Sequence, residues 1–79
     1  MSGLVERQIV QRFEEAERAG LLLHPETDAE RAALRRRIAT GEVIRVQRGL
    51  YALAARWSAL RPHERTTRIA RSMAALHPT

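Results

Sequence analysis

The sequence GEVIRVQRGLYAL, residues 41 to 53, constrains the fold most, because glycines bracket a pattern that is typical of a β-hairpin. A two-residue turn at Arg48 and Gly49 would give Gly49 the positive φ that such turns need, and would pair Val46 with Tyr51. The residues that this register places on a core-facing side are Ile44, Val46, Tyr51 and Leu53. The opposite side carries the rest of the two strands, which are Val43, Arg45, Gln47, Leu50 and Ala52. The sequence therefore predicts a ribbon with Arg45 on the outer side and Arg48 at an exposed tip.

Three further segments have helical patterns. The first has apolar residues at helical spacing and ends at Gly20, where a left-handed cap is favoured. Its apolar residues are Leu4, Val5, Ile9, Phe13 and Ala16. The third helix begins at Pro62, which the first turn of a helix tolerates. The side of this helix that we expect to face the core carries Thr66, Ile69, Met73 and Leu76.

The second helix is predicted over residues 28 to 40, between a capping box at Thr27 to Glu30 and Gly41. At 100° per residue, Leu34 and Ile38 define its inward direction. Arg36 then points outward, with Arg35 and Arg37 on either flank. The alanines that share this outer half are Ala29, Ala32 and Ala33. Such short side chains would let the backbone approach another surface closely, with arginines reaching past it.

The charge of the chain is divided along its length. All 14 basic residues are arginine, and residues 1–30 carry net −4 whereas residues 31–79 carry net +9. A basic face of this kind favours a polyanion, and nucleic acid is the commonest polyanion in a cytoplasm. An acidic protein partner or a membrane surface would satisfy the same electrostatics.

The remaining composition argues against an enzyme. A domain of 79 residues has little room for an enclosed active site. There is no cysteine, and His24, His63 and His77 have no spacing that would place two of them on one helical face, so we expect no metal and no cofactor. No apolar run is long enough to cross a membrane or to form the core of a signal peptide, so a cytoplasmic location is expected.

The order of helix, helix, two-stranded wing and helix predicts a mainly α, α+β fold of the winged helix-turn-helix type. The run LRRRIATGEVIRVQRGLYALAARWSALRPHER, residues 34 to 65, resembles the N-terminal domain of AbiEi-type antitoxins and related actinobacterial transcriptional regulators. The residues that carry this resemblance are Leu34, Gly41, Arg48, Gly49, Tyr51, Trp57, Leu60, Pro62, Glu64 and Arg65.

The resemblance implies a DNA-binding domain that represses its own toxin-antitoxin operon, with residues 1–79 as the N-terminal part of a longer protein. Helix 28–40 would enter the major groove and the wing, residues 42 to 53, would lie on the backbone. The expected DNA-binding residues are Arg35, Arg36, Arg37, Arg45, Gln47 and Arg48. The expected partner is double-stranded DNA, with a second copy of the chain or a C-terminal domain of the same protein as further partners. No membrane partner and no small-molecule substrate are expected.

Two observations keep alternatives open. Only the nine residues from Gly20 to Asp28 separate the first two helices, which leaves no room for the separate helix that usually precedes a recognition helix. Either the first helix bends into two or the turn is atypical. The same fold could also serve as a protein-interaction or dimerisation module, and acids that neutralise the arginines would favour that alternative.

Overall fold

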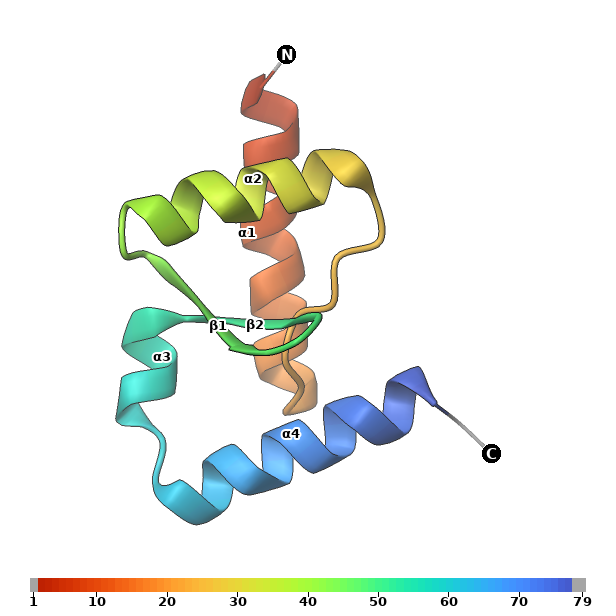
Figure 1. Ribbon diagram of the computed structural model, residues 1–79, viewed down its shortest axis with the longest axis vertical. Coiled ribbons are helices and arrows are strands. Elements are labelled where there is room, and N and C mark those ends of the chain that lie inside the picture. Colours follow the sequence, from red (N-terminus) through yellow and green to blue (C-terminus); the bar gives the residue numbers. More distant parts are fainter. Residues whose placement is uncertain (1, 78–79) are drawn as a thin grey trace.

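The fold is mainly helical with one antiparallel hairpin, as predicted. The computed structural model describes residues 2–77, and the side chains of residues 7–77. The elements in chain order are α1 (Ser2–Ala19), α2 (Asp28–Ala39), β1 (Val43–Gln47), β2 (Leu50–Leu53), α3 (Ala54–Ala59) and α4 (Pro62–Leu76). In Figure 1, α2 crosses α1 on one side, the hairpin lies in the middle of the molecule, and α4 crosses below it.

The helix starts and stops largely follow the predicted signals. Gly20 ends α1 at φ 71°, and Pro62 lies in the first turn of α4. Thr27 caps α2, because its hydroxyl accepts from the Glu30 amide at 3.1 Å. The second half of the predicted capping box differs, since the Glu30 carboxylate accepts from the amide of Glu26 rather than from that of Thr27.

The first two helices are joined by an extended segment instead of a further helix. The helix α1 is continuous, so it does not bend into two. Within the connecting segment, Leu23 exchanges two backbone hydrogen bonds of 2.9 Å with Tyr51 of β2. These bonds add a third chain segment to the edge of the hairpin and fix the connection against the sheet.

The hairpin register agrees with the prediction only at the turn. Gln47 pairs with Leu50 as expected, and Gly49 has φ 79°. The register then shifts by one between Arg45 and Gln47, so that Arg45 pairs with Tyr51. An extra residue, Val46, is accommodated there as a β-bulge, and a bulge reverses which side chains share a face beyond it.

Both faces of the hairpin are covered, so the predicted division into one core face and one outer face was wrong. On one face Val43, with Tyr51 and Leu53, packs into a cluster with residues of the first two helices and the connection, namely Ile9, Phe13, Leu23 and Leu34. On the other face Leu50 and Ala52, with Ile44 and Val46, pack with residues of the connection, α3 and α4. The side chains of Leu4 and Val5 lie outside the part of the chain whose side chains are described.

A short helix, α3, follows the hairpin directly and was not predicted. It carries Trp57, which is half-buried against the cluster around Leu50. Arg65 of α4 stacks over the indole at 5.4 Å from the ring centroid, and its Nε donates to the Trp57 carbonyl at 3.2 Å. These contacts connect α3 to α4.

Candidate nucleic-acid interface

The arginines of α2 occupy different environments. Arg35 and Arg36 are exposed, whereas Arg37 is half-buried and forms an ion pair with Glu42 in the loop before β1. Arg31, which the sequence interpretation left out, is exposed one turn before Arg35 and pairs with Asp28 at 2.9 Å. The spacing of four residues between Arg31 and Arg35 is the signal that could have found it.

The outward side of α2 differs from the predicted one. Ala33 and Leu34 are fully buried and Glu30 is largely so, while Ile38, expected to point inward, is 38% exposed. The inward direction therefore lies nearer Ala33 than Ile38, because the side chain of Glu30 is held toward α1. With 100° per residue, this rotation brings Arg35 closer than Arg36 to the middle of the outer side.

The hairpin contributes two exposed arginines, Arg45 from β1 and Arg48 from the turn. The turn is fixed to the segment between α1 and α2, because Nδ1 of His24 lies 2.9 Å from the carbonyl oxygen of Gly49 and donates to it. Gln47 is exposed as well, but its amide donates to Sδ of Met73 in α4 at 3.3 Å. The expected DNA-binding residue Gln47 is therefore engaged with α4, and Arg45 and Arg48 are the hairpin's outward cations.

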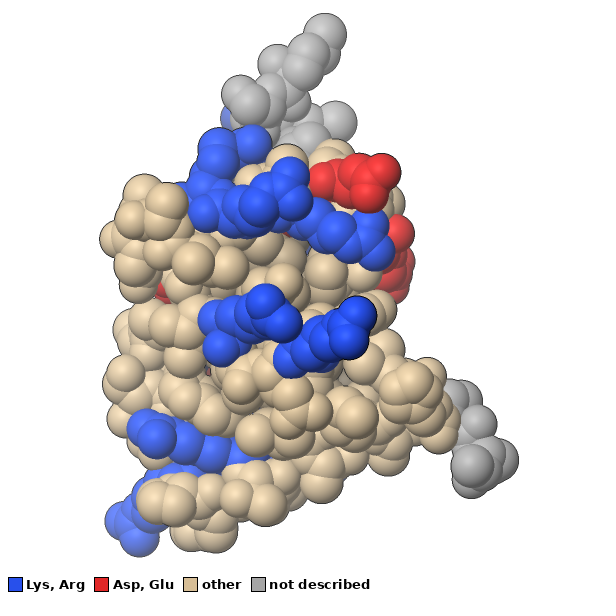
Figure 2. Space-filling view, viewed as in Figure 1, with Lys and Arg blue, Asp and Glu red and all other residues tan. Residues whose placement is uncertain are grey.

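These arginines form one basic face. Figure 2 shows basic side chains over α2 and over the hairpin in the same view, with acidic side chains gathered at the end where α2 begins. Among the described residues, Arg35, Arg45 and Arg48 make no ion pair, and the acids that could have neutralised them are engaged elsewhere. Glu30 is bound to Arg12, and Glu42 to Arg37. The face is thus positive over the hairpin and the later part of α2.

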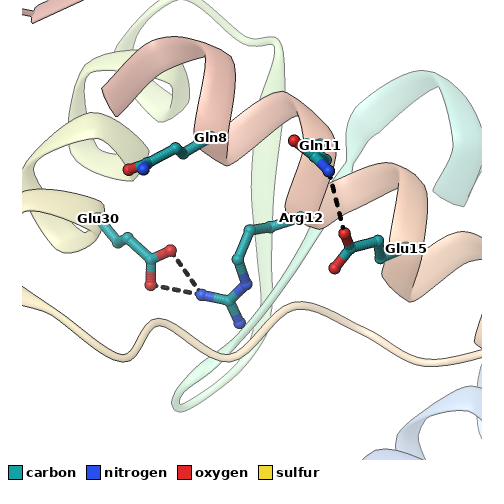
Figure 3. A pocket seen from close by; sticks show the side chains of 5 residues that line it. All are labelled: Gln8, Gln11, Arg12, Glu15 and Glu30. Atoms are coloured by element: carbon teal, nitrogen blue, oxygen red, sulfur yellow. Dashed lines mark hydrogen bonds and ion pairs between the residues drawn. The ribbon is translucent and has the colours of Figure 1, made fainter. Parts of the chain in front are cut away.

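A polar cleft of about 300 Å³ lies between α1 and α2, away from this basic face. Its lining residues are Gln8, Gln11, Arg12, Glu15 and Glu30. Figure 3 shows Arg12 and Glu30 pointing at each other across the cleft, with Gln11 bonded to Glu15 beside them. Burial raises the pKa of Glu30, but hydrogen bonds from Arg12 and from the Glu26 amide outweigh it and hold this pKa below its ordinary value.

This cleft has the properties of a structural site. A carboxylate with a lowered pKa that already accepts from a guanidinium is a weak general base and holds no proton to donate near neutral pH. Across the described part of the chain, no group of three or more histidine, cysteine or acidic side chains could hold a metal ion. Residues 2–77 also contain no helix with the length and hydrophobicity that crossing a membrane requires.

Comparisons with protein-family models, with curated proteins and with solved structures found no match to this chain.

Proposed function

We propose that this chain binds double-stranded DNA through the face formed by α2 and the β1–β2 hairpin. The observation that carries the proposal is that Arg35, Arg45 and Arg48 are exposed on that face and make no ion pair with described residues. Guanidinium groups without ion pairs on two elements of one face can bind the phosphates of a duplex, and arginine also binds guanine edges through two hydrogen bonds.

In the proposed complex, α2 enters the major groove and the hairpin lies along the phosphate backbone. A helix of 12 residues is about 18 Å long at 1.5 Å per residue, which suits a major groove. The start of α2 is acidic, because Glu26 and Asp28 are exposed there, so the phosphates would lie toward its later residues. The contacts to DNA would therefore come from Arg35 and Arg36 on α2, and from Arg45 and Arg48 on the hairpin.

The biological role that we propose is transcriptional repression in the cytoplasm. The resemblance of residues 34 to 65 to AbiEi-type antitoxins and related regulators supports this role, with the hairpin acting as the wing of a winged helix-turn-helix domain. In such a role the protein would bind the promoter of its own operon and repress it, as an antitoxin or a related regulator does.

Fluorescence anisotropy tests the proposal. Binding would be measured to the duplex upstream of the protein's own gene and to a scrambled duplex, each at about 50 and 200 mM salt. With three phosphate contacts, affinity should fall about 40-fold between these two salt concentrations, at a slope of about 0.9 per contact. Preference for the upstream duplex would support an operator.

Two variants and a matched control locate the interface. Arg35→Ala and Arg48→Ala should each weaken binding, and each should reduce the salt slope by about 1 if the residue contacts a phosphate. The control is Arg71→Ala, which removes the same charge from α4, where the guanidinium lies next to Gly20. This variant should leave binding unchanged. If neither duplex binds at low salt, the DNA proposal fails, and an acidic protein would become the partner to seek for this face.

A further inference from the structure

The helix α1 carries an exposed apolar side chain beside a groove. Val10 is 43% exposed, and it and Ile38 are the large apolar side chains that the described chain leaves most open to solvent. Val10 lines a groove of about 350 Å³ between α1 and the junction of β2 with α3. Leu53 and Ala55 provide further apolar lining, so the groove combines an apolar interior with an apolar residue at its edge.

Charges of both signs border this groove. Glu14 of α1 and Arg56 of α3 line it and are exposed, and neither forms an ion pair within the described part of the chain. Glu42 lines it too, but is paired with Arg37. At 100° per residue, Arg7, Val10 and Glu14 fall within a 60° sector of α1, so the exposed stripe reads positive, apolar, negative along the helix.

A stripe of this kind complements itself. In a two-fold pair each residue i contacts j of the partner while j contacts i, so both members of every contact must come from the same surface. Two antiparallel copies of α1 would bring Val10 together at the centre and place Arg7 opposite Glu14 on both sides. A partner of uniform charge would instead meet a like charge on Glu14 or on Arg56.

We propose that a second copy of this chain docks on the groove, with the two α1 helices antiparallel about a two-fold axis. The two Val10 side chains meet at the axis, at the edges of both grooves, and Glu14 of each copy faces Arg56 and Arg7 of the partner subunit. The arginines of the basic face, Arg35, Arg45 and Arg48, do not line this groove, so two copies could present two basic faces. This inference does not depend on the proposed binding of DNA.

Sedimentation equilibrium on the full chain, over about 5 to 500 µM, tests the proposal without any nucleic acid. The wild-type chain should associate to a dimer, and Glu14→Arg or Arg56→Glu should each weaken its association about tenfold or more, because like charges then face each other. Glu15→Arg is the matched control, since it makes the same change of charge at the neighbouring exposed position outside the groove. It should leave the dimer unchanged.

Mixing the two weakened variants gives the sharpest outcome. In a heterodimer of Glu14→Arg with Arg56→Glu, both contacts between positions 14 and 56 again join opposite charges, and only the contact of the Glu14→Arg side chain with Arg7 stays unfavourable. The mixture should therefore associate more tightly than either variant alone. A contact within one chain would not be restored by mixing. A wild-type chain that stays monomeric throughout, equal weakening by Glu15→Arg, or a mixture that does not associate would each overturn the proposal; circular dichroism of every variant checks that it is folded.

Discussion

Arg12 of α1 donates through Nη1 to both carboxylate oxygens of Glu30 in α2, at 2.5 and 2.6 Å. Its Nη2 donates to the carbonyl of His24 at 2.9 Å, so one guanidinium holds α1, the connecting segment and α2 together. Glu30 also accepts from the amide of Glu26 at 2.8 Å. This ion pair holds Glu30 on the inward side of α2, together with the buried Ala33 and Leu34, and this side lies opposite the exposed Arg35.

Replacing Arg12 with alanine should lower the free energy of unfolding by roughly 2 to 4 kcal/mol, because it leaves a largely buried carboxylate without its cation. The side chain of Glu30 is only 11% exposed, so water cannot fully replace the lost bonds. Urea denaturation at pH 7 measures the change. Arg18→Ala, at an exposed position of the same helix, should change stability by less than about 0.5 kcal/mol. Similar losses in both variants would show that the ion pair contributes nothing specific.

Stability should also depend on the ionisation of Glu30. The pKa of Glu30 in the folded chain lies below the ordinary value of 4.5, so the ionised form favours folding. This contribution is complete above pH 4.5 and is lost as the pH falls through the folded pKa. Urea denaturation between pH 7 and pH 3 should show the loss, and in Glu30→Gln the acid-dependent fall should be smaller. An identical pH profile in the two proteins would contradict this expectation.

Local signals along the sequence predicted the elements whose boundaries depend on local chemistry. Thr27, Gly41 and Pro62 mark helix ends because capping and positive φ are properties of a few adjacent residues. The turn at Gly49 was predicted for the same reason. The helix α3 was missed because it is only six residues long, too short to show a helical period.

The errors concern contacts between distant residues. No local pattern predicts that Arg12 will bind Glu30, which lies 18 residues away. The inward direction of α2 was therefore predicted from Leu34 and Ile38 alone. The bulge at Val46 could not be predicted either. Because both faces of the hairpin are covered by apolar residues, the alternation of apolar side chains fits the register with the bulge as well as the register without it. The exposure of Arg35, Arg45 and Arg48 could be predicted because charged side chains favour the surface. Only the structure shows that they form no ion pair with the acids whose side chains are described.

The conformation of the hairpin turn yields a paired prediction on glycines. Gly49→Ala and Gly41→Ala both place a side chain at positive φ, at 79° and 84°, which should cost each variant about 1 to 2 kcal/mol. A Cβ at Gly49 would lie 3.4 Å from Nδ1 of His24, which is an ordinary van der Waals contact, and one at Gly41 would meet nothing within 4 Å. Neither added methyl group clashes, so the two variants should lose similar amounts of stability in urea denaturation. A much larger loss in Gly49→Ala would show that the turn cannot accept a methyl group against His24.

The hydroxyl of Ser72 should contribute measurably to the free energy of unfolding, because it joins α4 to the connection between the first two helices. Its Oγ accepts from the Leu22 amide at 2.8 Å and donates to the Arg68 carbonyl at 2.7 Å, in a site where Ser72 is 3% exposed. Ser72→Ala leaves the Leu22 amide buried without an acceptor, which should cost about 1 to 3 kcal/mol.

Thr67→Ala provides the matched control for Ser72. The hydroxyl of Thr67 also donates to the carbonyl four residues earlier, that of His63 at 2.9 Å, but it is exposed and accepts from no other segment among the described residues. Its loss should change the free energy of unfolding by less than about 0.5 kcal/mol. Hydrogen exchange distinguishes the two effects directly, since the Leu22 amide should exchange faster in Ser72→Ala and at the wild-type rate in Thr67→Ala. Unchanged protection of Leu22 in Ser72→Ala would mean that another acceptor replaces the hydroxyl, and that α4 is held to the connecting segment by apolar packing alone.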